Sequence, residues 1–170
     1  MYTSLAGNIN PLSNAYNKII KLIKIRDRSS QEIEYFLLRE GVDKTLISKF
    51  ILSLKEDGLI DDEKFAKNRI LSRIRLKGWG KFRINGELLS LGISKEIIQQ
   101  ELEKIPEEDW LSEATKIIQK QLKKSSGSLE KDSINIRKKL FLKGYGEDMI
   151  QKVIKKLELS PNNQNSVVET

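Results

Sequence analysis

The sequence predicts an all-α fold of three tandem three-helix repeats that stack into an elongated, curved, solenoid-like body. Two observations predict the helices: apolar side chains recur at helical spacing, and no stretch shows the sustained alternation of a β-strand. A third predicts the repeats, because one long part of the chain matches another with glycines and apolar residues in register. Modules that touch mainly their neighbours give an extended body rather than a globule.

The internal repeat has an offset of 51 residues. Residues 15–51 align without a gap on residues 66–102, and apolar positions fall on apolar positions, as Ile19 does on Ile70. Residues 134–157 form a weaker third copy, at an offset of 52 residues from the second. Chance would not align apolar residues and glycines together. The glycines brought into register are Gly41, Gly92 and Gly144.

Each repeat is predicted to contain three helices. The second helix of the first repeat begins at Ser29, which has the capping-box spacing to Glu32. Each second helix ends at one of the three aligned glycines, where a left-handed residue is favoured. The third helices begin at Asp43 and Ser94, which are good N-caps. The first helices carry buried side chains four residues apart, which in the second repeat are Ala66, Ile70 and Ile74.

These elements divide the chain into five segments. Both terminal segments are polar and rich in turn-forming residues, so we expect them to be mobile. A loop at 123–132 makes the third repeat longer than the second. The predicted segments are an N-terminal tail (1–14), a first repeat (15–60), a second repeat (61–106), a third repeat (107–159) and a C-terminal tail (160–170).

Composition limits both the core and the chemistry. Hydrophobic residues make up 38% of the 170 residues and charged residues 32%, which disfavours one large core. The formal net charge of +7 favours polyanions or acidic protein surfaces as partners. The absence of cysteine and histidine excludes disulfides, cysteine-based zinc sites and Ser–His or Cys–His catalysis. Since no signal peptide or membrane-spanning run is visible, we expect a soluble cytoplasmic monomer without a cofactor.

The acidic cluster Asp61, Asp62 and Glu63 could in principle hold Mg²⁺, as a nuclease would require. We interpret it instead as a helix N-terminus, in which an aspartate cap is followed by acids that complement the helix dipole. We therefore expect no catalytic activity and no bound metal.

The stretch from Lys64 to Arg83 contains eight Lys or Arg residues and no acid. Arg69 and Arg73 fall beside the predicted buried stripe, and Leu22 is the counterpart of Arg73 in the first repeat. We interpret Arg73 as a packing edge whose stem covers apolar surface, so Arg73→Leu should leave thermal stability nearly unchanged or raise it. The outward candidates for contact with a partner are Lys64, Lys67, Arg75, Lys77 and Lys81.

Trp79 lies in a Gly-Trp-Gly loop between the first and second helices of the second repeat. An exposed tryptophan there would serve as an interface anchor or as a stacking platform for a base. Alternatively, Trp79 folds back to cover the junction of the two helices, and the glycines permit the turn. The sequence favours neither reading.

Residues 59–102 resemble the central repeat of the RecX family, bacterial proteins that modulate the RecA recombinase. The shared pattern is an acidic pair before Phe-Ala, then basic residues and a Gly-x-Gly turn. The threefold repeat extends the resemblance to roughly 16–157. Trp79 departs from the small or basic residue common in the family, and the third repeat is divergent. The pattern continues with the pairs Arg83-Ile84, Glu87-Leu88 and Gly92-Ile93.

The resemblance implies a non-enzymatic regulator that binds RecA–single-stranded DNA filaments along their groove and limits RecA activity. The alternative is a sequence-nonspecific DNA-binding protein that acts without RecA. Sequence-specific reading is disfavoured, because the third helices open with acids that repel phosphate. The residues expected to contact the filament or its DNA are Lys64, Lys67, Arg75, Lys77, Trp79, Lys81 and Arg83.

Overall fold

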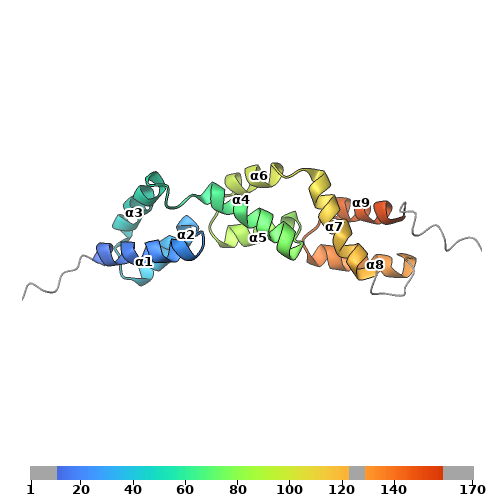
Figure 1. The fold of residues 1–170 in the computed structure, drawn as a ribbon, viewed down its shortest axis with the longest axis horizontal. Coiled ribbons are helices and arrows are strands. Elements are labelled where there is room, and N and C mark those ends of the chain that lie inside the picture. The colour runs from blue at the N-terminus through green and yellow to red at the C-terminus, as the bar shows by residue number, and fades with distance from the viewer. Residues whose placement is uncertain (1–10, 123–128, 159–170) are drawn as a thin grey trace, which may run out of the picture. The chain divides into compact units, whose positions relative to one another are not determined.

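The computed structural model of the chain describes residues 11–122 and 129–158, and their regular secondary structure is entirely helical (Figure 1). The prediction of an all-α fold is confirmed. The helices in these ranges are α1 (Pro11–Ile25), α2 (Ser30–Arg39), α3 (Lys44–Glu56), α4 (Asp62–Ser72), the π-helical turn η1 (Arg73–Lys77), α5 (Lys81–Ser90), α6 (Lys95–Glu103), α7 (Glu107–Leu122), α8 (Leu129–Leu142) and α9 (Glu147–Glu158).

Two helices begin earlier than the sequence indicated. Helix α1 starts at Pro11, inside the segment assigned to the N-terminal tail. Proline suits the first helical position, because its φ is preset and the N–H that it lacks would have no partner there. Helix α8 starts at Leu129, inside the segment assigned to the long loop. The rest of the N-terminal tail and all of the tail at 160–170 lie outside the described residues.

The predicted N-caps of α2 and α3 and the three predicted turn glycines are confirmed. Ser29 caps α2, and the capping box with Glu32 is complete, because each residue accepts a hydrogen bond from the backbone N–H of the other. At the start of α3, Asp43 Oδ1 accepts the N–H of Thr45 at 2.8 Å. The glycines after α2, α5 and α8 have φ of 78°, 75° and 86°, as a left-handed helix end requires.

The chain divides into two compact units. The first unit holds the residues up to Lys67 together with Leu88–Ile97, and the second holds Asn68–Glu87 together with the residues from Ile98 onward. In the first unit α2 packs on α3, around a core that includes Ile19, Ile33, Leu37, Ile47 and Leu54. In the second unit α7 and α8 both pack on α9, and η1 packs on α7. No helix in the described ranges has the length and apolar character to cross a bilayer.

A turn of one repeat contacts the start of a helix in the preceding repeat, at two equivalent places. In the first unit, Ser29 Oγ donates a 2.7 Å hydrogen bond to the carbonyl oxygen of Leu91, in the turn between α5 and α6. In the second unit, the N–H of Gly80 donates a 2.8 Å bond to the carbonyl oxygen of Lys143, in the turn between α8 and α9. Ser29 and Gly80 are equivalent in the sequence repeat, as are Leu91 and Lys143. The repeat therefore governs these contacts as well as the helices.

The second of these contacts brings two backbones together. The N–H of Phe82 donates a 3.0 Å hydrogen bond to the carbonyl oxygen of Gly144, and a Cβ added to Gly80 would lie 2.4 Å from that same oxygen. Real Cβ atoms do not approach an oxygen so closely. Glycine is needed at position 80 because another backbone occupies the space where a side chain would be.

We expect Gly80→Ala to lower the free energy of unfolding by about 1–3 kcal/mol, the usual cost of overpacking, because the new Cβ forces the two backbones apart. Gly86→Ala is the matched control. Gly86 lies within α5, where an added Cβ meets nothing within 4 Å, so alanine should stabilise the helix by about 0.5–1 kcal/mol. Urea unfolding followed by circular dichroism measures both. Equal effects of the two substitutions would contradict the close approach at Gly80.

Candidate interaction surface of the second repeat

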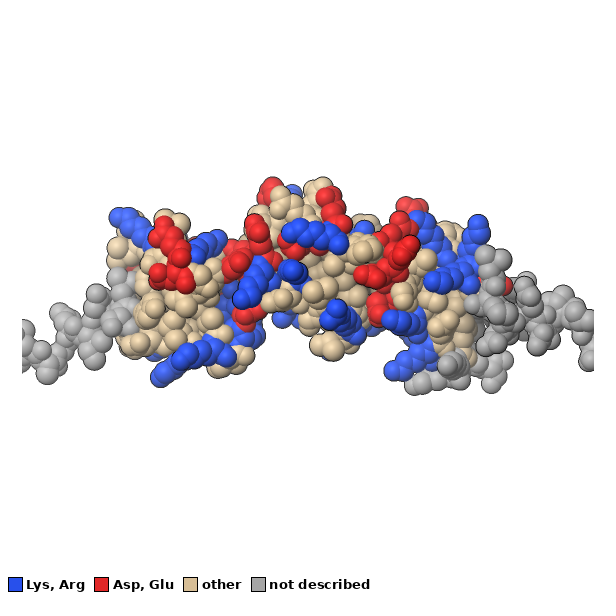
Figure 2. Space-filling model, turned by 45° about the horizontal axis from the view of Figure 1, so that its top comes forward, with Lys and Arg blue, Asp and Glu red and all other residues tan. Residues whose placement is uncertain are grey.

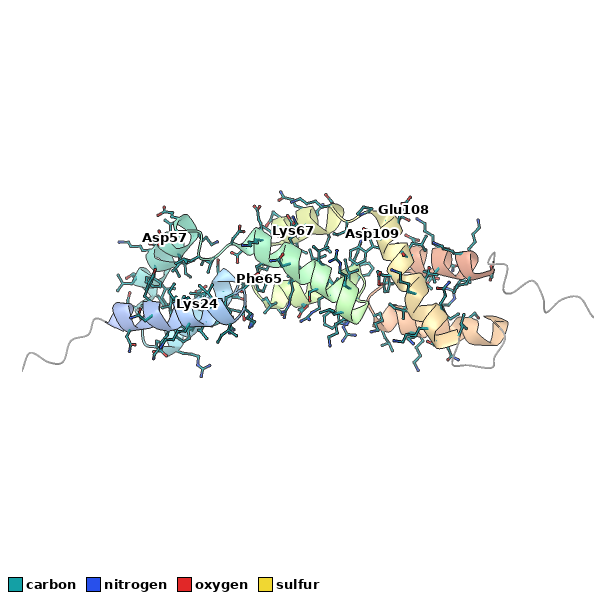
Figure 3. The ribbon with its side chains drawn as sticks, viewed as in Figure 1. Lys24, Asp57, Phe65, Lys67, Glu108 and Asp109 are labelled. Carbon is teal, nitrogen blue, oxygen red and sulfur yellow. The ribbon has the colours of Figure 1, made fainter. Side chains whose placement is uncertain are left out.

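The basic stretch lies on α4 and continues through the π-helical turn η1. The predicted buried stripe is confirmed, since Ala66, Ile70 and Ile74 are all buried. Figure 3 labels two neighbours on α4, Phe65 and Lys67, of which the first is buried and the second exposed. The wide π turn was not predicted, because it leaves the apolar spacing of the stripe unchanged.

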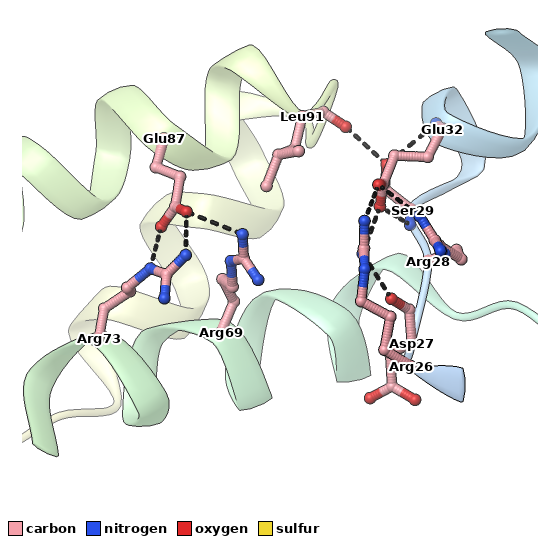
Figure 4. Close-up of polar contacts among 9 residues, drawn as sticks. All are labelled: Arg26, Asp27, Arg28, Ser29, Glu32, Arg69, Arg73, Glu87 and Leu91. Atoms are coloured by element: carbon pink, nitrogen blue, oxygen red, sulfur yellow. Dashed lines mark hydrogen bonds and ion pairs between the residues drawn. The ribbon is translucent and has the colours of Figure 1, made fainter. Parts of the chain in front are cut away.

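Two arginines of the basic stretch point inward and share one carboxylate (Figure 4). Arg73 donates two hydrogen bonds to Glu87, at 2.7 Å from Nε and 2.5 Å from Nη2, and Arg69 donates one at 2.9 Å. All three side chains are less than a third exposed. Burial acts to raise the pKa of Glu87, but the hydrogen bond from Arg73 and the charges of Arg69 and Arg73 together hold that pKa below its usual value.

The interpretation of Arg73 as a packing edge is therefore wrong. Its role is structural, but it acts through a partly buried, bidentate ion pair rather than through its stem alone. The comparison with Leu22 led to the wrong interpretation because the residue that Arg73 contacts also differs between the two repeats. The residue equivalent to Glu87 in the first repeat is Phe36, so an ionic pair stands where the first repeat has two apolar residues.

We expect Arg73→Leu to lower the free energy of unfolding by about 1–3 kcal/mol, because Glu87 loses the two charge-assisted hydrogen bonds that Arg73 donates. The double variant Arg73→Leu with Glu87→Phe, which installs the residues of the first repeat, should recover part of that loss. Urea unfolding measures both variants. Wild-type stability in the single variant would restore the packing-edge interpretation.

The same ion pair predicts a dependence of stability on pH. The pKa of Glu87 is lower in the folded state than its ordinary value of 4.5. The ion pair therefore stabilises the fold fully above about pH 4.5, and this stabilisation is lost as the pH falls through the folded-state pKa. The stability difference between wild type and Glu87→Gln should be present near pH 7 and shrink below about pH 4.5. Unfolding in urea across this pH range measures it. A difference that stayed constant into acid would show that Glu87 is not the titrating group.

Trp79 is half-buried, and its ring contacts side chains of the second unit. The guanidinium carbons of Arg73 and Arg83 lie 5.1 and 4.3 Å from the centroid of its ring, distances at which cation–π attraction acts. Arg83 also donates a 2.9 Å hydrogen bond to the carbonyl oxygen of Leu142. These contacts support the reading in which Trp79 covers the helix junction rather than offering a free ring to a base.

The acidic residues at the start of α4 serve the fold. Asp61 Oδ1 accepts the N–H of Lys64 at 2.9 Å, which confirms the predicted N-cap. Asp62 accepts hydrogen bonds from the N–H and the Oγ of Ser30, at 2.8 and 2.6 Å, and pairs with Lys55 at 3.0 Å. Among residues 11–122 and 129–158, no group of three acidic side chains is placed to hold a metal ion. The carboxylate of Asp62 thus links α4 to α2.

The other cations of the basic stretch are exposed, although Arg83 lies over the ring of Trp79 and Lys81 over that of Trp110. The exposed ones in the first unit are Lys64 and Lys67, and those in the second are Arg75, Lys77, Lys81 and Arg83. Unlike Arg69 and Arg73, none of these six forms an ion pair with a carboxylate in the part of the chain that the structure describes. Figure 2 shows basic and acidic side chains interspersed on the face that it displays. The outward cations are therefore distinguished by their lack of a carboxylate partner rather than by a surface of one sign.

Three further lysines, which were not predicted as site residues, lie close together in the structure. Lys120 from α7, Lys139 from the end of α8 and Lys143 directly after it line a hollow of about 340 Å³. Lys143 Nζ donates a 2.7 Å hydrogen bond to the carbonyl oxygen of Lys77, which joins this group to the basic stretch. One signal for Lys143 was present in the sequence, because it directly precedes a turn glycine and is the only cation at that position in the three repeats.

Comparison with known proteins gives consistent matches. A family model for the second three-helix domain of RecX matches residues 61–102. The regulatory protein RecX of Oceanobacillus iheyensis is 32% identical over 156 residues, which cover 91% of this chain and 57% of that protein. The regulatory protein RecX of Clostridium botulinum strain Eklund 17B is 32% identical over 140 residues, which cover 80% of this chain and 65% of that protein. The chain thus spans less than two thirds of the length of these relatives.

Two crystal structures share the fold. That of RecX from Lactobacillus salivarius superposes with a TM-score of 0.82 at 22% sequence identity, covering 89% of this chain and 99% of that one. A second, of a regulatory protein RecX, gives a TM-score of 0.76 at 17% identity, with coverage of 90% and 81%. These likenesses confirm the prediction of an all-α helical repeat fold.

Proposed function

The chain belongs to the RecX family of regulatory proteins, and we propose that it binds RecA–single-stranded DNA filaments and lowers the recombinase and ATPase activity of RecA. This function places the protein in the cytoplasm, in homologous recombination, DNA repair and the SOS response. It requires no catalytic group, and the acids of α4 that a nuclease would use are engaged in capping and in contacts between helices.

The observation that carries the proposal is the division of the basic stretch into two sets. Arg69 and Arg73 are paired within the fold with Glu87, whereas cations such as Arg75 are exposed without a carboxylate partner among the described residues. Both sets lie within residues 61–102, the segment that the family model matches. A protein filament on DNA offers acidic side chains and phosphate groups, which attract the second set.

We expect reversal of three outward charges, Lys64, Arg75 and Lys81 to Glu, to cost several kcal/mol of filament affinity, if each contact contributes about 1–2 kcal/mol as charge-assisted hydrogen bonds do. The readout is inhibition of the DNA-stimulated ATP hydrolysis of RecA, with circular dichroism to verify the fold. Exposed substitutions usually change stability little, so the helical content should persist. Normal inhibition by a well-folded triple variant would show that these side chains are only a solvated face.

A charge-matched control separates contact from net charge. Lys24, labelled in Figure 3, and Lys44 and Lys49 are exposed on helices of the first repeat. Reversing these three changes the net charge by the same amount but should leave inhibition close to that of wild type. Co-sedimentation with preassembled RecA filaments, with naked single-stranded DNA as the reference, then tests the partner. Binding to naked DNA as tight as binding to the filament would favour the DNA-binding alternative.

A further inference from the structure

A group of five cations gathers in the second unit, where the turn after α8 meets η1 and the start of α5. Lys143 is at its centre. Its ammonium group donates a hydrogen bond to the carbonyl oxygen of Lys77 and is repelled by the charges of Arg83, Lys139 and Lys77. Burial lowers the pKa of Lys143, and the repulsion from these three neighbours lowers it further. Lys120 faces the same hollow from the end of α7, which passes in front of α8 in Figure 1. We call Lys77, Arg83, Lys120, Lys139 and Lys143 the junction cluster.

The carbonyl ends of nearby helices do not balance this charge. Lys77 ends η1, Lys120 and Lys139 lie in the last turns of α7 and α8, and Lys143 directly follows α8. Each helix end contributes only about half a negative charge, so three ends offset about 1.5 of the five positive charges. No carboxylate lines the hollow, and none pairs with a member of the junction cluster among the described residues. About 3.5 positive charges are left for an external anion.

The lining indicates the kind of anion. Its described lining consists of Ile117, Gln121 and the three lysines, and none of these described residues is aromatic. Protein interfaces usually gain their affinity from anchor residues, in particular tryptophan, tyrosine and arginine buried in pockets. Lysines that act as separate point charges suit phosphate groups, and they suit several phosphates on one flexible strand better than a single carboxylate.

We propose that the junction cluster binds the phosphate backbone of single-stranded DNA, with Lys120, Lys139 and Lys143 contacting phosphates in the hollow and Lys77 and Arg83 contacting the strand beside it. The proposal deepens the proposed function and rests on it for the identity of the strand, because single-stranded DNA is the polyanion within a RecA filament. The contact is independent of base sequence, since it is made to phosphate alone.

The test uses the full chain and a fluorescent oligo(dT), without RecA. In the double variant Lys120→Gln with Lys139→Gln, the log–log slope of affinity against salt should fall in magnitude by about 1.4, since each phosphate contact on a single strand contributes about 0.7. Affinity should weaken equally for oligo(dT) and for a mixed sequence. Lys143 is left intact because its bond to Lys77 supports the fold.

The matched control is Lys44→Gln with Lys49→Gln, which removes the same charge from exposed positions on α3. It should retain the wild-type slope. Thermal unfolding followed by circular dichroism verifies that both double variants are folded. An unchanged slope in the Lys120 and Lys139 variant, or a wild-type protein that does not bind oligo(dT), would overturn the proposal.

The RecA assay distinguishes this proposal from the proposed function. If the Lys120 and Lys139 variant binds DNA normally but no longer inhibits RecA, the junction cluster contacts an acidic protein surface and the proposal of DNA contact is overturned. If wild type has no effect on RecA but the variant loses DNA affinity, the phosphate site stands and the proposed function fails.

Discussion

Each of the two described junctions between repeats is closed by a hydrogen bond from the start of a second helix to the carbonyl group just before a turn glycine. The start of a helix has N–H groups without intrahelical partners, and a turn exposes carbonyl groups, so the two ends satisfy each other. The donor differs between the junctions. Ser29 uses its hydroxyl, because Glu32 occupies its N–H in the capping box. Gly80 has no side chain and donates its own N–H, which brings the two backbones into contact.

This contact explains why the functional candidates of the second unit lie where they do. Holding the turn after α8 against the start of α5 places Lys143 beside Lys77 and places Arg83 beside the carbonyl group of Leu142. Trp79 lies in the loop that makes the contact, and its ring is held by Arg73 and Arg83. Like charges would not gather in this way without a rigid backbone to hold them. The junction therefore sets both the fold and the local positive potential.

The repeats keep their backbone while exchanging the side chains that decide what they can bind. The apolar pair of positions Leu22 and Phe36 becomes the ionic pair Arg73 and Glu87, and Leu91 becomes Lys143. The buried stripe and the turn glycine are unchanged in each case, although the helix is α-helical at Leu22 and π-helical at Arg73. The repeats therefore share a buried stripe and a turn glycine but differ in the charge that they carry at these positions.

Local patterns in the sequence are enough to predict most helices, the caps, the buried stripe and the register of the repeat, because these depend on spacing along the chain. Ser29 with Glu32, Asp43 and the three turn glycines could all be identified in this way. The roles of Arg73, Gly80 and Lys143 depend instead on packing, since their partners lie 14 to 66 residues away. A helical wheel places Arg73 beside the core but cannot show that Glu87 faces it. Spacing likewise marks Gly80 as a turn residue but cannot show that a second backbone passes there, because that approach exists only once the repeats have packed.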